Sequence, residues 1–125
     1  MQHNSEKPDK LFWRVFLETR TTEKAHKLIN RFSKSVGRKP DELNLEPYLK
    51  INGFVASFTC NVEAQNWNDA VVEAISLGQR VGRGWCLAGN VFQDLSGYCN
   101  ETSVSGIVFV EWWLLIKDAK AESGK

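Results

Sequence analysis

The stretch GIVFVEWWLLIK, residues 106–117, is apolar on both sides of the strand that it predicts. A half-buried strand alternates apolar and polar residues, because successive side chains point to opposite faces of a sheet. Here the even-numbered residues from 108 to 116 are all apolar, and so are most of the odd-numbered ones. A single carboxylate, Glu111, interrupts the second set. The pattern therefore predicts a sheet with two apolar faces and a charge in one of them.

The first part of the chain predicts a strand followed by a helix. Residues 11–19, LFWRVFLET, have a wholly apolar odd-numbered side up to Leu17 and predict the first strand. Residues 22–36 repeat apolar side chains at helical spacing. Either Thr21 or Thr22 can cap this helix, and the glycine that follows residue 36 is a natural stop.

The middle of the chain predicts a hairpin, a helix and another strand. Residues 46–64 hold strand patterns on both sides of Asn52-Gly53, a dipeptide that favours a two-residue hairpin turn. The alternative is a bulge inside one long strand. Residues 68–81 have the spacing of a second helix, and residues 85–98 predict one strand with a bend at Gly89.

The predicted order β-α-β-β-α-β-β indicates an α+β fold with a mainly antiparallel sheet. A ferredoxin-like two-layer sandwich accommodates this order, with both helices on one face. We expect a single domain over residues 10–118, with disordered tails over residues 1–9 and 119–125.

If both helices lie on one face, strand alternation assigns the remaining side chains to the opposite face. The wholly apolar sides of the strands should face the helices, including Trp85, Leu87 and Val91. The opposite face then mixes large aromatic side chains with a few polar groups. Its expected members are Phe12, Arg14, Phe16, Glu18, Val55, Ser57, Thr59, Asn61, Asn90, Phe92, Ile107, Phe109, Glu111, Trp113 and Leu115.

Such an aromatic face needs a cover. At about 25 cal/mol per Å², leaving several aromatic side chains in water would forgo several kcal/mol. A second copy packed about a two-fold axis is the simplest cover, and two such sheets can enclose an aromatic cavity for a small apolar or cationic ligand. The leading hypothesis is therefore a non-enzymatic, homodimeric binding module. Its candidate ligand or interface residues are Phe12, Arg14, Phe16, Asn90, Phe92, Phe109, Glu111 and Trp113.

Arg14 and Glu111 have two interpretations. One is a structural ion pair or two charges at the rim of an interface. The other is a pair that orients a ligand, with Glu111 facing a cation or acting as a base. The second interpretation leads to a further hypothesis, a small enzyme with a cavity at its dimer interface.

The composition of the chain limits the classes of partner that we expect it to bind. The chain has 125 residues, is 42% hydrophobic and 25% charged, and carries a net charge of +1. This gives no global field toward nucleic acid or an anionic membrane. The first ten residues lack the apolar core of a signal peptide, and cytoplasm is the expected location. The three cysteines are unclustered and predict free thiols.

One charged segment supports an alternative function. Between Arg20 and Lys39, seven basic residues oppose one acidic residue, Glu23. A solvated helix face explains most such runs. The alternative is an accessory protein that contacts nucleic acid or an acidic protein surface through this face. The basic residues of that face are Lys24, Lys27, Arg31 and Lys34.

Catalytic and metal-binding patterns are scarce. His3 and His26 have no metal-ligand spacing to another candidate ligand, and no nucleophile elbow occurs. The glycine-rich segment at residues 78–85 follows a helix, whereas anion-binding amides precede one. The sequence thus predicts no catalytic residue, no metal and no cofactor.

Overall fold

The computed structural model describes residues 8, 10–90, 92 and 94–115, with side chains as far as Leu114. The expected tails therefore lie outside the described residues, apart from Pro8. The elements, in chain order, are β1 (Lys10–Leu17), α1 (Thr22–Val36), β2 (Asp41–Tyr48), the 3₁₀ helix η2 (Leu49–Ile51), β3 (Gly53–Asn61), α2 (Trp67–Gln79), β4 (Gly82–Arg83), β5 (Cys86–Asn90), β6 (Asp94–Cys99), β7 (Glu101–Thr102) and β8 (Ile107–Leu115).

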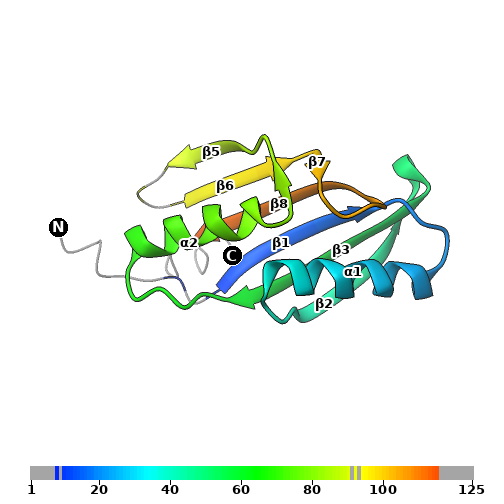
Figure 1. Ribbon diagram of the computed structural model, residues 1–125, viewed down its shortest axis with the longest axis horizontal. Helices are drawn as coiled ribbons and strands as arrows, with labels where there is room; N and C mark the ends of the chain where they lie inside the picture. Colours follow the sequence, from blue (N-terminus) through cyan, green and yellow to red (C-terminus); the bar gives the residue numbers. More distant parts are fainter. Residues whose placement is uncertain (1–7, 9, 91, 93, 116–125) are drawn as a thin grey trace, which may run out of the picture.

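Six strands form one sheet in the order β2-β3-β1-β8-β6-β5, and every described pairing in it is antiparallel. Strands β4 and β7 form a small second sheet. Both α-helices lie on the same side of the large sheet, with α1 across β3 and α2 near β8 (Figure 1). The predicted α+β class, the two helices and the mainly antiparallel sheet are confirmed.

Helix α1 has the predicted limits because both of its ends are capped. The Thr21 hydroxyl accepts a hydrogen bond from the Lys24 amide at 3.2 Å. Gly37 adopts a left-handed conformation, φ 80°, and its amide donates to the Ser33 carbonyl. A residue with a Cβ would be strained at this angle, and so glycine ends the helix.

The predicted hairpin is present between β2 and β3, but its turn is longer than two residues. Tyr48 pairs with Gly53, and η2 and Asn52 lie between them. Asn52 takes the left-handed conformation, with φ 52°. A Cβ on Gly53 would lie 1.9 Å from the Leu17 carbonyl oxygen, so this glycine allows β3 to pass close to β1.

The prediction of one strand over residues 85–98 is wrong. This segment forms the hairpin β5–β6, in which Cys86 pairs with Tyr98 and Asn90 with Asp94. Leu87, expected to face the helices, is 47% exposed on the edge strand. Asp94 accepts a hydrogen bond from the Asn90 amide, which helps to close the turn. The prediction for Val91 lies outside the described residues.

The core fills the space between the helices and one face of the sheet. It contains the predicted apolar side of β1 and most of those of β3 and β8, with Trp13 and Trp112 among its largest members. Val108, which was also predicted to face the helices, is only half-buried. The Trp13 ring packs edge-on against Phe32 of α1 at 5.2 Å, and its Nε1 donates to the Cys60 sulfur. Burial raises the pKa of the Cys60 thiol, which packs as a small apolar group.

A bulge in β8 changes the predicted facing of Ile107. Phe16 pairs with Phe109 but Leu17 pairs with Ile107, which leaves Val108 as an extra residue. One inserted residue reverses the alternation beyond it. Ile107 is therefore buried in the helix-side core, where the uninterrupted alternation had assigned it to the opposite face. The predictions for the Leu115 side chain and for Ile116 lie outside the described residues.

The two edges of the large sheet differ in composition. Strand β2 carries Glu42, Glu46 and Pro47 on one edge. Strand β5, CLAGN, forms the other edge, has no charged residue and is exposed along its whole length. Charges and proline on an edge discourage pairing with another strand, so only β2 has this protection.

Candidate ligand and interface site on the open face

The face of the sheet opposite the helices is called the open face here, because no helix of the described residues packs on it (Figure 1). Cross-strand register places its side chains in rows, and most of them are half-buried against one another. Its members from β1, β3, β6 and β8 are Phe12, Arg14, Phe16, Val55, Ser57, Thr59, Ser96, Tyr98, Phe109, Glu111 and Trp113.

A row of aromatic rings crosses one end of the open face. The Phe16 ring contacts Tyr48 at 5.1 Å and Phe109 at 5.5 Å, both edge-on. Phe109 in turn stacks with Tyr98 at 5.8 Å. The row joins β2, β1, β8 and β6. Aromatic pairs in these geometries contribute about 0.5–1.5 kcal/mol beyond their buried area, so the row also stiffens the sheet.

Arg14 and Glu111 form a pair at the centre of the open face. They are directly opposite in the β1–β8 register, and Arg14 Nη1 lies 3.5 Å from Glu111 Oε2. The Arg14 guanidinium also lies over the Trp113 ring, 5.3 Å from its centre. Burial raises the pKa of Glu111, and the positive charge of Arg14 opposes this shift. The pair thus holds a partly desolvated carboxylate among aromatic side chains.

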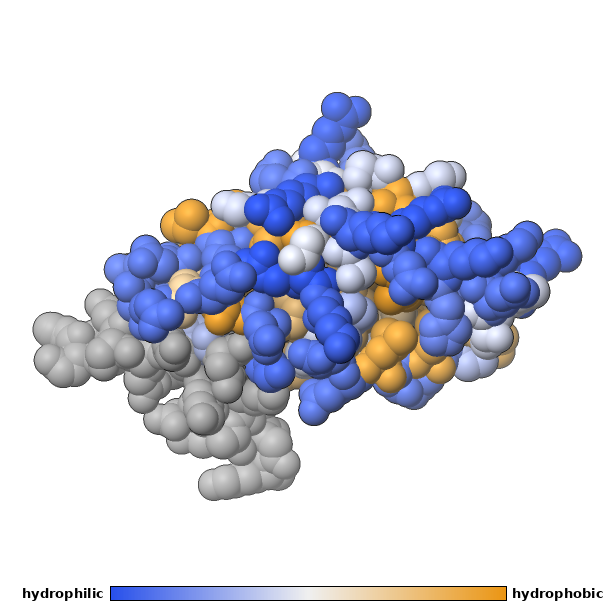
Figure 2. Space-filling model, turned by 60° about the horizontal axis from the view of Figure 1, so that its bottom comes forward, coloured by the Kyte–Doolittle hydropathy of each residue, from blue (hydrophilic) through white to orange (hydrophobic). Residues whose placement is uncertain are grey.

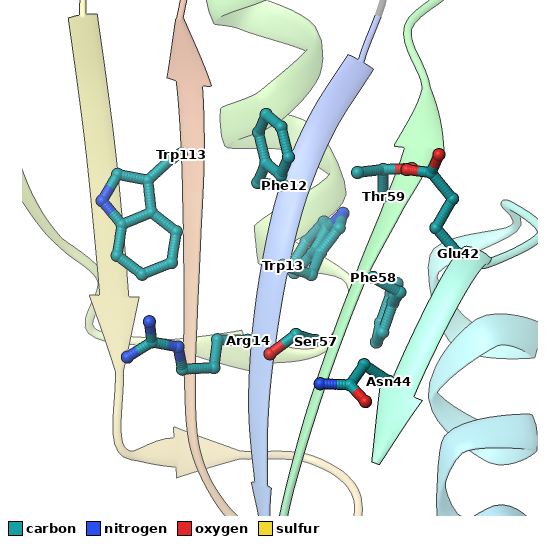
Figure 3. A pocket seen from close by; sticks show the side chains of 9 residues that line it. All are labelled: Phe12, Trp13, Arg14, Glu42, Asn44, Ser57, Phe58, Thr59 and Trp113. Carbon is teal, nitrogen blue, oxygen red and sulfur yellow. The ribbon is translucent and has the colours of Figure 1, made fainter. Parts of the chain in front are cut away.

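A hollow of about 400 Å³ lies beside this pair, across β1, β3 and β2 (Figure 3). We call it the β1–β3 hollow. Trp113 and Arg14 stand at one end, and Glu42 and Asn44 of β2 stand at the other. Trp13 and Phe58 bound it from beneath, because both are buried in the helix-side core. The remaining lining residues are Phe12, Ser57 and Thr59.

Six of the residues that line this hollow were not predicted as site residues, and two of the six, Thr59 and Glu42, have unusual features. Thr59 is only 3% exposed, and its hydroxyl has no hydrogen-bond partner in the part of the chain that the structure describes. Glu42 has φ 56° and occupies a bulge, since Asp41 pairs with Thr59 but Asn44 pairs with Ser57. The alternation of β3 does place Thr59 on the open face. No periodic signal reveals Glu42, because the bulge sets its direction.

Six of the eight predicted ligand or interface residues lie together on the open face. Phe12, Arg14 and Trp113 line the β1–β3 hollow, Glu111 adjoins it, and Phe16 and Phe109 belong to the aromatic row. The other two, Asn90 and Phe92, lie at the β5–β6 turn, because residues 85–98 form a hairpin. There the Phe92 amide donates to the Asn90 side chain, and the Phe92 ring is 66% exposed.

Tyr98 adds a polar contact at the margin of the open face. It is directly opposite Cys86 in the β5–β6 register. A hydrogen bond between their side chains raises the pKa of Tyr98. Both residues are exposed, so the pair lies at the rim of the face and not within the hollow.

Basic residues gather on α1, on the side of the molecule that Figure 2 brings forward, where hydrophilic side chains dominate. A second hollow of about 540 Å³ lies along them. Three of the predicted basic residues, Lys24, Lys27 and Arg31, line it, whereas Lys34 does not and Arg20 joins instead. Arg20, Lys24, Lys27 and Arg31 form what we call the basic stripe.

Neither a three-residue metal-ligand group nor a membrane-spanning helix occurs among the described residues. No group of three His, Cys, Asp or Glu side chains in that part of the chain could hold a metal ion. None of its helices combines the length and apolar character needed to cross a bilayer.

Comparisons of the chain with protein-family models, with curated proteins and with solved structures find no match. Functional inference therefore depends on the geometry of the open face and of the basic stripe.

Proposed function

We propose that this protein is a small binding module that dimerises through the open face and holds a small molecule in the β1–β3 hollow. The observation that carries the proposal is the aromatic surface formed by Phe12, Phe16, Phe109 and Trp113 on a face without a described helix. Soluble monomers seldom leave a contiguous patch of this kind in water. Covering it would gain several kcal/mol at about 25 cal/mol per Å².

The charges at the centre of the open face favour a second copy of this chain as the cover. A two-fold interface must be self-complementary, because the same patch occurs on both sides. Arg14 and Glu111 carry opposite charges side by side. A two-fold axis next to them brings each Arg14 toward the second copy's Glu111. Phe16 and Phe109, beside them, supply the apolar contact.

We also propose that the fold is ferredoxin-like, because the strand order fits that topology. Strands β2-β3-β1-β8 have the arrangement of two interleaved β-α-β units, in which β1 and β2 flank β3 while β3 and β8 flank β1. In this view the β5–β6 hairpin is an insertion before the last strand, and it extends the sheet. A wider sheet offers a larger face to a second copy.

Light scattering on the purified protein over a dilution series tests the dimer. We expect the mass of two chains for the wild type and of one chain for Phe16→Lys, because a buried ammonium without a partner is costly. Phe16 does not line the β1–β3 hollow, so this change leaves the ligand site intact. The matched control is Phe92→Lys at the exposed β5–β6 turn.

Circular dichroism must first show that Phe16→Lys keeps its secondary structure and melts cooperatively. If it does not, Phe109→Lys replaces it, since Phe109 occupies the neighbouring place in the aromatic row. A wild-type protein with the mass of a single chain at every concentration rejects the dimer. A folded Phe16→Lys protein that still has the mass of two chains rejects this face as the interface.

The basic stripe supports a second candidate function, contact with the phosphates of a nucleic acid. Lys24, Lys27 and Arg31 follow one another at helical spacing on α1, and Arg20, which precedes the N-cap, lines the same hollow. None of the four makes an ion pair with another described residue. Phosphate contacts of this type release counterions, and so their strength falls steeply with salt.

Fluorescence anisotropy with a labelled single-stranded RNA and a labelled DNA duplex tests this candidate. We expect binding at low salt that weakens as salt rises, and that weakens further in a Lys27→Gln/Arg31→Gln protein. The control is Arg83→Gln, which removes a positive charge already paired with Glu101. Equal binding by the wild type and the double variant, or none at low salt, rejects the candidate.

A further inference from the structure

The β2 end of the β1–β3 hollow is rich in hydrogen-bond acceptors. Asn44 donates its Nδ2 to Glu46 at 2.9 Å, so its carbonyl oxygen remains available. The Glu42 carboxylate accepts from and pairs with no described residue. A carboxylate is an acceptor only, and an amide oxygen likewise. This end of the hollow therefore suits a group that donates hydrogen bonds.

The buried Thr59 hydroxyl points to an occupant. It lines the hollow between Phe12 of β1 and Asp41 of β2, and it makes no hydrogen bond with any described residue although it is almost fully buried. Leaving a buried polar group unsatisfied costs about 1–3 kcal/mol. Nearly all such groups in native proteins have a partner, which can be a ligand. A bound donor at this position would satisfy the hydroxyl.

The backbone of β2 is distorted where it presents Glu42. At this bulge Glu42 and Leu43 occupy the space opposite a single residue, Phe58. Glu42 takes φ 56°, a conformation that residues with a Cβ seldom adopt. Bulges redirect side chains, and strained residues concentrate at binding sites. The distortion is what brings the carboxylate to the hollow.

The other end of the hollow is apolar, and its basic side chain, Arg14, already contacts an aromatic ring and a carboxylate. Phe12 and Trp113 stand side by side across β1 and β8 (Figure 3). The Arg14 guanidinium lies over the Trp113 ring and beside Glu111, so its charge is balanced. The charge without a described partner in the hollow is therefore negative, that of Glu42.

From these features we infer that the β1–β3 hollow binds a small organic cation with a flat apolar body, of the arylalkylamine class. The ring packs on Phe12, and the ammonium donates to the Glu42 carboxylate and the Thr59 hydroxyl. Strands β1 and β2 flank β3 and so are about 10 Å apart, a distance that matches the length of such a molecule. The inference rests on the proposed function, since it names the ligand class for that same face.

Isothermal titration calorimetry with phenethylamine tests the inference. We expect wild-type binding, at least about tenfold weaker binding by Glu42→Gln and about fivefold weaker binding by Thr59→Val. Both changes keep the shape of the side chain, and Thr59→Val removes an unsatisfied hydroxyl, so the fold should persist. The control Glu23→Gln removes a carboxylate on α1, far from the hollow, and should bind as the wild type does.

Two analogues of phenethylamine test whether the positive charge of the ligand contributes to binding. Phenethyl alcohol and 3-phenylpropionate keep the ring but replace the ammonium with a neutral and an anionic group. We expect the amine to bind best and the carboxylate worst. Equal binding of amine and alcohol, or preference for the carboxylate, overturns the inference and assigns recognition to the ring or to Arg14.

The same titrations on Phe16→Lys separate the inference from the proposed dimer. Amine binding by a single-chain protein retains the ligand class and rejects the dimer as a requirement. A wild-type dimer that shows no heat and no amide chemical-shift change with phenethylamine overturns the ligand class and leaves the dimer standing. Undiminished binding by Glu42→Gln overturns the inference in either oligomeric state.

Discussion

The surroundings of Glu111 in the folded protein disfavour the charged form of its carboxylate. Its side chain is 20% exposed and lies among aromatic groups on the open face. Arg14, at 3.5 Å and 49% exposed, is too distant and too solvated to offset the burial in full. The pKa of Glu111 is therefore raised, which means that folding disfavours its charged form relative to the unfolded chain.

This shift predicts the pH dependence of stability. Between its pKa in the unfolded chain and the raised pKa in the folded protein, Glu111 binds more protons when folded. The stabilisation from Glu111 is thus complete below the unfolded pKa and is lost as pH rises through the folded pKa. Urea unfolding across this interval should show a smaller decline with pH for Glu111→Gln than for the wild type.

The control for this experiment is Glu23→Gln, which leaves Glu111 in place and should keep the wild-type slope. Indistinguishable pH profiles for the wild type and Glu111→Gln would falsify the argument from burial.

Substitution of Phe32 tests the assigned hydrophobic core, also at the scale of a single residue. Its ring is buried and packs edge-on against Trp13 and against Phe58. Phe32→Ala should lower the free energy of unfolding by about 3–5 kcal/mol, because it removes buried area and leaves a cavity. Phe92→Ala, at an exposed position, should change it by less than about 0.5 kcal/mol. Chemical denaturation compares the two, and similar losses would contradict the assigned core.

Single residues also mark the limit of prediction from sequence. Alternation along β1 and β8 correctly placed Arg14 and Glu111 on one face, because the two strands are regular there. It could not identify Glu42, whose direction depends on a bulge defined by pairing with β3. It also placed Thr59 on the face without showing that its hydroxyl is buried and unsatisfied. Pairing partners are long-range information, absent from a local pattern.

At the scale of elements, helix α1 illustrates how local chemistry sets a boundary. Thr21 and Thr22 are both candidate caps in the sequence, and Thr21 provides the hydrogen bond. Thr21→Ala should therefore lower the free energy of unfolding by about 1 kcal/mol. Thr22→Ala should change it by less than about 0.5 kcal/mol, because alanine is a good helix former in the first turn. Thermal or urea unfolding measures both, and equal losses would count against the assigned cap.

The β5–β6 hairpin is the element that the sequence failed to predict. Residues 85–98 contain enough apolar side chains to resemble one strand, and the turn lacks proline and a strong hairpin dipeptide. The turn forms instead through side-chain oxygens, since Asn90 and Asp94 accept hydrogen bonds from nearby amides. The limits of α1 were predictable because its cap and stop are local, whereas α2 begins one residue earlier and ends two residues earlier than the predicted range of 68–81. The boundary between β5 and β6 depends on the pairing of β6 with β8.

At the scale of the whole molecule, the helices of the described residues cover only one face of the six-stranded sheet. If a second copy covers the other, folding and association are linked, and the midpoint of thermal unfolding rises with protein concentration. Differential scanning calorimetry should show this rise for the wild type and its absence for Phe16→Lys. A midpoint independent of concentration in the wild type would argue that the open face does not dimerise.

The unequal edges of the sheet suggest where new architecture could be attached. Among the described strands, β5 pairs only with β6, and its outer peptide groups have neither charge nor proline nearby. A designed extension that docks alongside β5 would find ready backbone partners, whereas the same peptide beside β2 would meet Glu42, Glu46 and Pro47. Growth of this scaffold by engineering therefore has a preferred direction, away from the β1–β3 hollow.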